Sequence, residues 1–164
     1  MADIWTTIAA ERNRAADEFE HLTPEQLATP SQCDAFDVRQ ACAHLLLPFE
    51  YSTPRFLLGV LANRGNLDAF SRKATHKLAE RYSHAEVISK LRQHATNEWT
   101  PPGNKFGPEI PLSEIVVHSQ DIRNVLGMAC TIPAETIDLA LDGITDDEVR
   151  RDYANRIGSA ALAG

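Results

Sequence analysis

The sequence predicts an all-α protein, a four-helix up-and-down bundle with extra short helices. Three observations predict this class. Apolar residues recur at spacings of three, four and seven, and no segment shows the apolar–polar alternation of a strand. Helix-start signals, in which Ser, Thr or Asp precedes Glu or Gln by three positions, stand before several of these segments. Four main antiparallel helices would close one core, so residues 1–164 are expected to form a single domain.

The first expected helix covers residues 3–21, where apolar residues follow helical spacing. Thr23 and Gln26 have the spacing of a capping box, which predicts one short helical turn after it. Asp37 and Gln40 have the same spacing and open the second long helix.

Pro48 and Pro54 divide the chain after this second helix, so we expect it to end or bend near Leu47. Thr145 and Glu148 are the expected caps of the last helix. Further helices are expected at residues 55–62, 67–81, 84–99 (with a capping box of Ser83 and Glu86), 112–126 and 134–141, and from 146 onward.

Charge and composition exclude several classes of partner. The net charge is −7, and the sequence has no Lys/Arg cluster, which argues against nucleic-acid and anionic-membrane partners. The apolar runs "HLLLPF" and "FLLGVLA" are too short to span a bilayer, and the N-terminus lacks the apolar core of a signal peptide. The odd set of Cys33, Cys42 and Cys130 has no CxxC pair, which predicts reduced, partly buried thiols. We therefore expect a cytoplasmic protein.

The segment "PLSEIVVHSQDIRNVLGM" carries polar residues inside an apolar pattern. At about 100° per residue, Glu114, His118 and Asp121 fall within about 60° of one another, between Val117 and Ile122. These three side chains are thus expected to point into the core. The opposite side of the helix carries Ser119, Gln120, Arg123 and Asn124.

Two interpretations of the inward polar residues remain open. Glu114 and His118 can satisfy each other by a hydrogen bond, as buried polar groups usually do. Alternatively, a Glu and a His one helical turn apart suit two ligands of one metal ion. His44 lies in the apolar run "ACAHLLL" and needs a partner, which can be a backbone carbonyl or that same ion. A His₂Glu set leaves a coordination position open, as catalytic sites do.

Two segments in this order, "LTPEQLATPSQCDAFDVRQACAHL" and then "PLSEIVVHSQDIRNVLG", resemble the DinB-like superfamily. More narrowly they resemble the mycothiol-dependent maleylpyruvate isomerase family. The resemblance implies a four-helix bundle that holds a divalent metal, usually zinc, through His44, Glu114 and His118. It further implies that Asp121 orients His118. Phe36 and Asp37 stand where the family usually has Trp-Thr. They keep an aromatic side chain and an N-cap residue at these two positions.

The family's isomerases carry a further C-terminal domain that supplies a basic catalytic residue. This chain ends at "RIGSAALAG", so we expect that domain to be absent, either because the chain is truncated or because it is a single-domain relative. Its absence weighs against maleylpyruvate itself as substrate. The expected activity is that of a metal-dependent S-transferase or isomerase that uses a low-molecular-weight thiol. Mycothiol is the candidate thiol cosubstrate, and the second substrate would be a small electrophile. A metal-dependent hydrolase and a non-catalytic metal-binding bundle are the alternatives, and a homodimer is left open.

The segment "TPPGNKFGPEIP", residues 100–111, contains four prolines and two glycines and predicts a long loop. Such loops often carry binding residues, so we expect it to shape a cleft at the site, although a plain connection is the alternative. Lys105 is its one basic residue and the candidate to attract an anionic substrate. Phe36, with Pro48 and Phe49, is the other candidate substrate contact.

Overall fold

The computed structural model describes residues 3–33, 36–100, 107–142, 144 and 146–161. This part of the chain forms ten helices and no strand, so the predicted all-α class is confirmed. The four-helix up-and-down arrangement remains a prediction. The helices are α1 (Ile4–Phe19), α2 (Pro24–Leu27), α3 (Val38–His44), α4 (Leu47–Glu50), α5 (Thr53–Ala62), α6 (Leu67–Arg81), α7 (His84–Gln93), α8 (Glu109–Leu126), α9 (Ala134–Asp142) and α10 (Asp147–Ala161).

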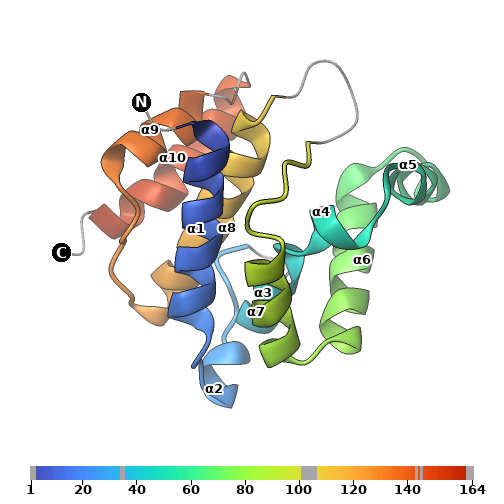
Figure 1. Ribbon diagram of the computed structural model, residues 1–164, viewed down its shortest axis with the longest axis horizontal. Helices are drawn as coiled ribbons and strands as arrows, with labels where there is room; N and C mark the ends of the chain where they lie inside the picture. Colours follow the sequence, from blue (N-terminus) through green and yellow to red (C-terminus); the bar gives the residue numbers. More distant parts are fainter. Residues whose placement is uncertain (1–2, 34–35, 101–106, 143, 145, 162–164) are drawn as a thin grey trace.

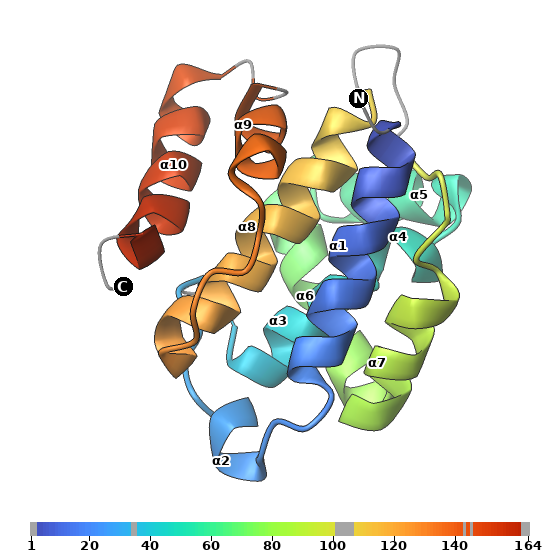
Figure 2. The same ribbon diagram turned by 60° about the vertical axis from the view of Figure 1, so that its left-hand side comes forward.

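Helix α8 lies at the centre of the molecule (Figures 1 and 2). It packs against α1 and α3, while α9 and α10 cover its other side. Helices α6 and α7 pack against α3, and α1 also contacts α7. Helix α5 stands at the edge of the molecule and contacts α6 (Figure 1). The core between these helices is fully buried at Ile8, Phe19, Leu46, Val116 and Ile122.

The second predicted helix is broken as the prolines predict. Helix α3 ends at His44, and α4 begins at Leu47 with Pro48 in its first turn. A proline is tolerated there because N–H groups of the first turn have no acceptor within the helix. Leu46 and Leu47 on either side of the break are buried. The break therefore leaves His44 at the end of α3, where its ring can reach α6 and α8.

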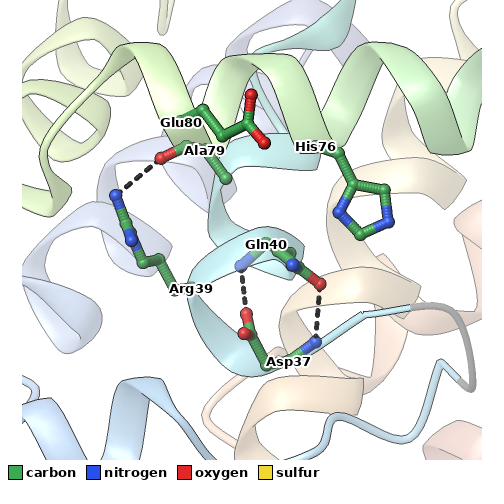
Figure 3. Close-up of a pocket in the computed structure, with 6 residues that line it drawn as sticks. All are labelled: Asp37, Arg39, Gln40, His76, Ala79 and Glu80. Carbon is green, nitrogen blue, oxygen red and sulfur yellow. Dashed lines mark hydrogen bonds between the residues drawn. The ribbon is translucent and has the colours of Figure 1, made fainter.

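The three predicted capping boxes are present. Figure 3 shows the one that opens α3, in which Asp37 Oδ1 accepts from the Gln40 N–H at 2.7 Å. Gln40 Oε1 accepts from the Asp37 N–H at 3.1 Å in return. The other two boxes pair Thr23 with Gln26 and Ser83 with Glu86. Thr145, the predicted cap of α10, lies outside the described residues. Within them, Asp146 Oδ1 accepts from the N–H groups of Glu148 and Val149.

Helix α7 is shorter than predicted, because it ends at Gln93 rather than near Trp99. The buried guanidinium of Arg12 on α1 explains this end. Its Nη1 donates to the carbonyl oxygens of His94, Ala95 and Asn97 at 3.3, 3.0 and 2.7 Å. These carbonyls are thereby satisfied without a further helical turn.

Helix α8 begins three residues earlier than predicted and ends, as predicted, before Gly127, which has a left-handed φ of 65°. Its side opposite Glu114 is buried as well, because α1, α9 and α10 cover it. Arg123 there is fully buried and pairs with Glu18 of α1 at 2.6 Å, and its Nη1 donates to Ser119 at 2.8 Å. Helix α8 therefore packs against other helices on both of its sides, instead of presenting one polar side to solvent.

None of the described helices combines the length and the apolar character that crossing a lipid bilayer requires. The three cysteines carry free thiols, as predicted: Cys42 is buried, and Cys33 and Cys130 are partly buried.

Candidate metal centre

The structure brings His44, Glu114 and His118 together, with one potential ligand atom from each within 4.8 Å of the others. The His44 residue comes from the end of α3, and the other two lie one turn apart on α8. Glu114 Oε2 lies 3.3 Å from His118 Nε2 and 3.7 Å from His44 Nε2. Among the described residues, this is the one group of three or more such side chains with that spacing.

The 3.3 and 3.7 Å separations are close to those between two ligands of one shared ion, and the longer one exceeds a hydrogen-bond distance. Ligands about 2.1 Å from a tetrahedral zinc ion lie about 3.4 Å from one another. An N–H···O hydrogen bond, by contrast, has a donor–acceptor distance of about 2.7–3.2 Å. The distances from the Glu114 carboxylate to the two rings are thus similar to the distance between two ligands of one zinc ion. The residues present therefore fit a divalent metal ion.

Both imidazole rings are held by their other nitrogen. His44 Nδ1 lies 2.9 Å from Thr75 Oγ1 on α6, and His118 Nδ1 lies 3.3 Å from Asp121 Oδ2. The two rings stand nearly perpendicular, at 83°, with centroids 4.7 Å apart. Metal-binding histidines commonly donate one N–H to such a partner and present the other nitrogen to the metal. This orientation turns both Nε2 atoms toward Glu114.

Asp121 is itself fixed by the C-terminal helix. Its side chain is fully buried, and Arg156 of α10 donates from Nε to Oδ1 at 2.9 Å and from Nη2 to Oδ2. The sequence predicts a role for Asp121 but not for Arg156 or Thr75, which lie 35 and 31 positions from their partners. No local pattern marks either residue, so only the packing of α10 and α6 identifies them.

The charges of the site are coupled. Burial alone would raise the pKa of Glu114, but the two imidazoles outweigh burial and hold that pKa well below its usual range. Burial would lower the pKa of His118, yet Asp121 and Glu114 raise it to about 10. The pKa of His44 is lowered, mainly by burial. Without an ion, the site therefore holds a charged His118, a neutral His44 and an ionised Glu114 at neutral pH.

The site opens into a cleft of about 730 Å³. Glu114 remains 43% exposed there, whereas the two histidine side chains are 12% exposed each. Phe36 lines the cleft, as expected for a substrate contact, and its ring centroid lies 5.4 Å from that of His44. Pro48 and Phe49 line it as well. The wall also includes Trp99, which precedes the predicted loop, and Ile110 and Pro111, which end it and lie in the first turn of α8. Lys105 lies outside the described residues.

A second, smaller depression of about 90 Å³ lies between the start of α3 and α6 (Figure 3). Three of its five polar side chains are engaged in structural bonds: Asp37 and Gln40 cap α3, and Arg39 donates to the Ala79 carbonyl at 2.6 Å. The larger cleft is therefore the candidate functional site.

Fold and site together define an all-α protein with a candidate His₂Glu metal centre in the wall of a largely apolar cleft. Comparison of the chain with protein-family models, with curated proteins and with solved structures finds no match. The resemblance to the DinB-like superfamily therefore stays a prediction.

Proposed function

We propose that this protein is a metal-dependent S-transferase or isomerase that uses a low-molecular-weight thiol. His44, Glu114 and His118 would hold the ion, for which zinc is the first candidate because two imidazoles and one carboxylate are ligands it prefers. The observation that carries the proposal is the convergence of these three side chains, with both Nδ1 atoms held, beside a cleft of about 730 Å³. The sequence resemblance to the mycothiol-dependent maleylpyruvate isomerase family makes mycothiol the candidate thiol.

Each part of the chain has a role in this proposal. When bound, the ion would supply Lewis acidity that lowers the pKa of a thiol and so favours the nucleophilic thiolate. Thr75 and Asp121 keep the Nε2 atoms of His44 and His118 directed at the ion site. The aromatic ring of Phe36 and the walls of the cleft exclude water and orient an electrophile such as an activated alkene, an epoxide or a halide.

A metal-dependent hydrolase is the second candidate, since three protein ligands also leave room for a water molecule. A non-catalytic metal-binding bundle is the third. The open cleft beside Glu114 favours an enzyme over this last alternative, because a purely structural site is normally closed by four protein ligands.

Metal content is the first test of the proposal. Purified wild-type protein is expected to contain about one equivalent of a divalent metal by elemental analysis, and His44→Ala is expected to lose it. His76→Ala serves as the matched control, because His76 lies on α6 outside the cluster. Equal, negligible metal in wild-type and His44→Ala protein after reconstitution with zinc would contradict the proposal.

Reaction products separate the first two candidates. Metal-loaded protein is incubated with a thiol and an alkylating substrate, and a thioether adduct is sought by mass spectrometry. A thioether formed faster with wild-type protein than with His44→Ala supports the transferase. Hydrolysis of an ester or amide substrate without thiol consumption supports the hydrolase instead.

A further inference from the structure

The cleft beside the candidate metal centre has an apolar outer wall that is open to solvent. Leu57 and Leu61 of α5 and Leu67 of α6 line it while 53%, 72% and 51% exposed. The rest of its lining is also largely apolar and includes Phe56, Val60, Leu91, Trp99 and Ile115. Exposed apolar surface is unfavourable in proportion to its area, and an apolar ligand in the cleft would remove it from water. The wall is therefore suited to an apolar molecule rather than to a small, fully polar substrate.

Arg12 places a buried positive charge in the lining of the same cleft. Its residue is 3% exposed, and no described carboxylate forms an ion pair with it. All three of its hydrogen bonds within the described chain leave from Nη1, toward the carbonyl groups after α7. Burial lowers the pKa of Arg12 only to about 10, so the guanidinium stays charged at neutral pH.

The Nη1 bonds explain how Arg12 ends α7, but they use only one nitrogen of the guanidinium. The Nε and Nη2 donors have no hydrogen-bond partner among the described residues. This pair of donors has the fork geometry that binds the two oxygens of a carboxylate. Arg12 and Phe49 both line the cleft, and the Arg12 guanidinium carbon lies 4.8 Å from the centroid of the Phe49 ring. The Nε and Nη2 donors of this buried cation are therefore the candidate contacts for an anion in the cleft.

We propose that the cleft binds an amphipathic carboxylate, with its apolar chain along the Leu57, Leu61 and Leu67 wall and its carboxylate on Arg12. The volume of the cleft, about 730 Å³, lies within the range of about 300–1,000 Å³ typical of sites for small organic molecules. The inference rests on the proposed function in treating this cleft as the substrate site, and it names the class of substrate.

Binding is tested first with wild-type protein freed of metal by a chelator, so that no carboxylate can bind through an ion. Straight-chain carboxylates from butanoate to decanoate are titrated by calorimetry. The Kd is expected to fall about fourfold for each added methylene group. Octanoate is expected to bind at least about tenfold more tightly than 1-octanol, because the alcohol has no charge for Arg12. A Kd independent of chain length, or equal affinities for acid and alcohol, would overturn the proposal.

Two leucines of α5 give a matched pair of variants. Leu61→Gln places a polar group in the wall and is expected to raise the Kd of octanoate about tenfold. Leu58 is 65% exposed on the same helix but does not line the cleft, so Leu58→Gln is expected to leave the Kd unchanged. If Leu58→Gln weakens binding as much as Leu61→Gln, or if the wall proves to be a dimer contact that Leu61→Gln dissociates without affecting octanoate, the proposal fails.

Arg12→Lys tests the anion site. It keeps the charge but loses the fork, so octanoate is expected to bind about tenfold more weakly while 1-octanol is unaffected. Thermal unfolding of Arg12→Lys and wild-type protein checks that the variant stays folded. Unchanged octanoate binding in Arg12→Lys, with weaker binding in the variant Arg72→Gln at the exposed rim, would overturn the assignment.

The two proposals can fail separately. Octanoate binding by metal-free protein, together with no thioether formation by metal-loaded protein, would refute the thiol transferase and leave the amphipathic site standing. Thioether formation, together with a Kd that does not change with the chain length of the carboxylate, would support the thiol transferase and refute the amphipathic site.

Discussion

His44 is the last residue of α3, and this place lets its ring reach both α6 and α8. Its ring lies against Phe36, its Nδ1 meets Thr75, and its Nε2 faces Glu114. A histidine in a run of buried leucines would otherwise leave a polar ring without a partner, which costs free energy. The same arrangement that satisfies the ring also directs its Nε2 toward Glu114, as the candidate metal centre requires.

Replacing Glu114 by Gln tests the one anionic ligand. Gln keeps the shape of the side chain but loses the negative charge, so the affinity for zinc is expected to fall by more than the roughly tenfold to hundredfold loss typical of residues that only support a ligand. Circular dichroism is expected to be unchanged, because Glu114 is 43% exposed to the cleft. Zinc titration against a chromophoric chelator measures the affinity. If the variant binds zinc as tightly as wild type, Glu114 is not a ligand.

At the scale of elements, α4 is short and depends on contacts with its neighbours. Its last residue, Glu50, accepts from Lys90 Nζ of α7 at 2.8 Å and from the Tyr82 hydroxyl at 2.7 Å. Burial would raise the pKa of Glu50, but these hydrogen bonds outweigh burial and lower it. The carboxylate thereby ties α4, which carries Pro48 and Phe49 of the cleft wall, to the junction of α6 and α7.

Glu50→Gln is expected to lower the free energy of unfolding by roughly 1.5–3 kcal/mol at pH 7, the contribution of hydrogen bonds to a charged group. Because the folded-state pKa is depressed, this stabilisation is complete above the ordinary pKa of about 4.5 and is lost as the pH falls through the folded-state value. Urea unfolding of both proteins between pH 7 and about pH 3, which extends below the ordinary pKa, measures the difference. The exposed Glu98 provides the control Glu98→Gln, and a Glu50 effect that does not shrink at low pH would contradict this account.

At the scale of the whole molecule, the C-terminal helix α10 is connected to the candidate metal centre. Arg156 holds Asp121, and Asp121 holds His118, so the position of one ligand depends on a helix about forty residues further along the chain. Tyr153 of α10 also lines the cleft, and burial raises the pKa of its hydroxyl above the usual range. Helix α10 is therefore part of the site as well as of the fold.

Arg156→Gln is expected to weaken zinc binding about tenfold to a hundredfold, as loss of a group that supports a metal ligand commonly does. Arg151→Gln is the matched control, because Arg151 lies on the same helix, is exposed and bonds the carbonyl of Asp147 within α10. Zinc affinity and thermal unfolding are measured for both. Equal zinc affinity in the two variants would show that Asp121 orients His118 without help from Arg156.

The sequence by itself determined the helical class, the three capping boxes, the end of α8 at Gly127 and the choice of His44, Glu114 and His118. Each of these rests on local chemistry: apolar spacing, a side chain within three or four positions of the backbone group it caps, two residues one turn apart, or, for His44, a polar ring in an apolar run. Only the tertiary structure decided the early end of α7, which Arg12 of α1 sets through long-range hydrogen bonds. Tertiary packing alone also decided the burial of Arg123, the roles of Thr75 and Arg156, and the apolar wall of the cleft. These features join residues tens of positions apart. The apolar periodicity of one segment does not predict which helix will pack against it.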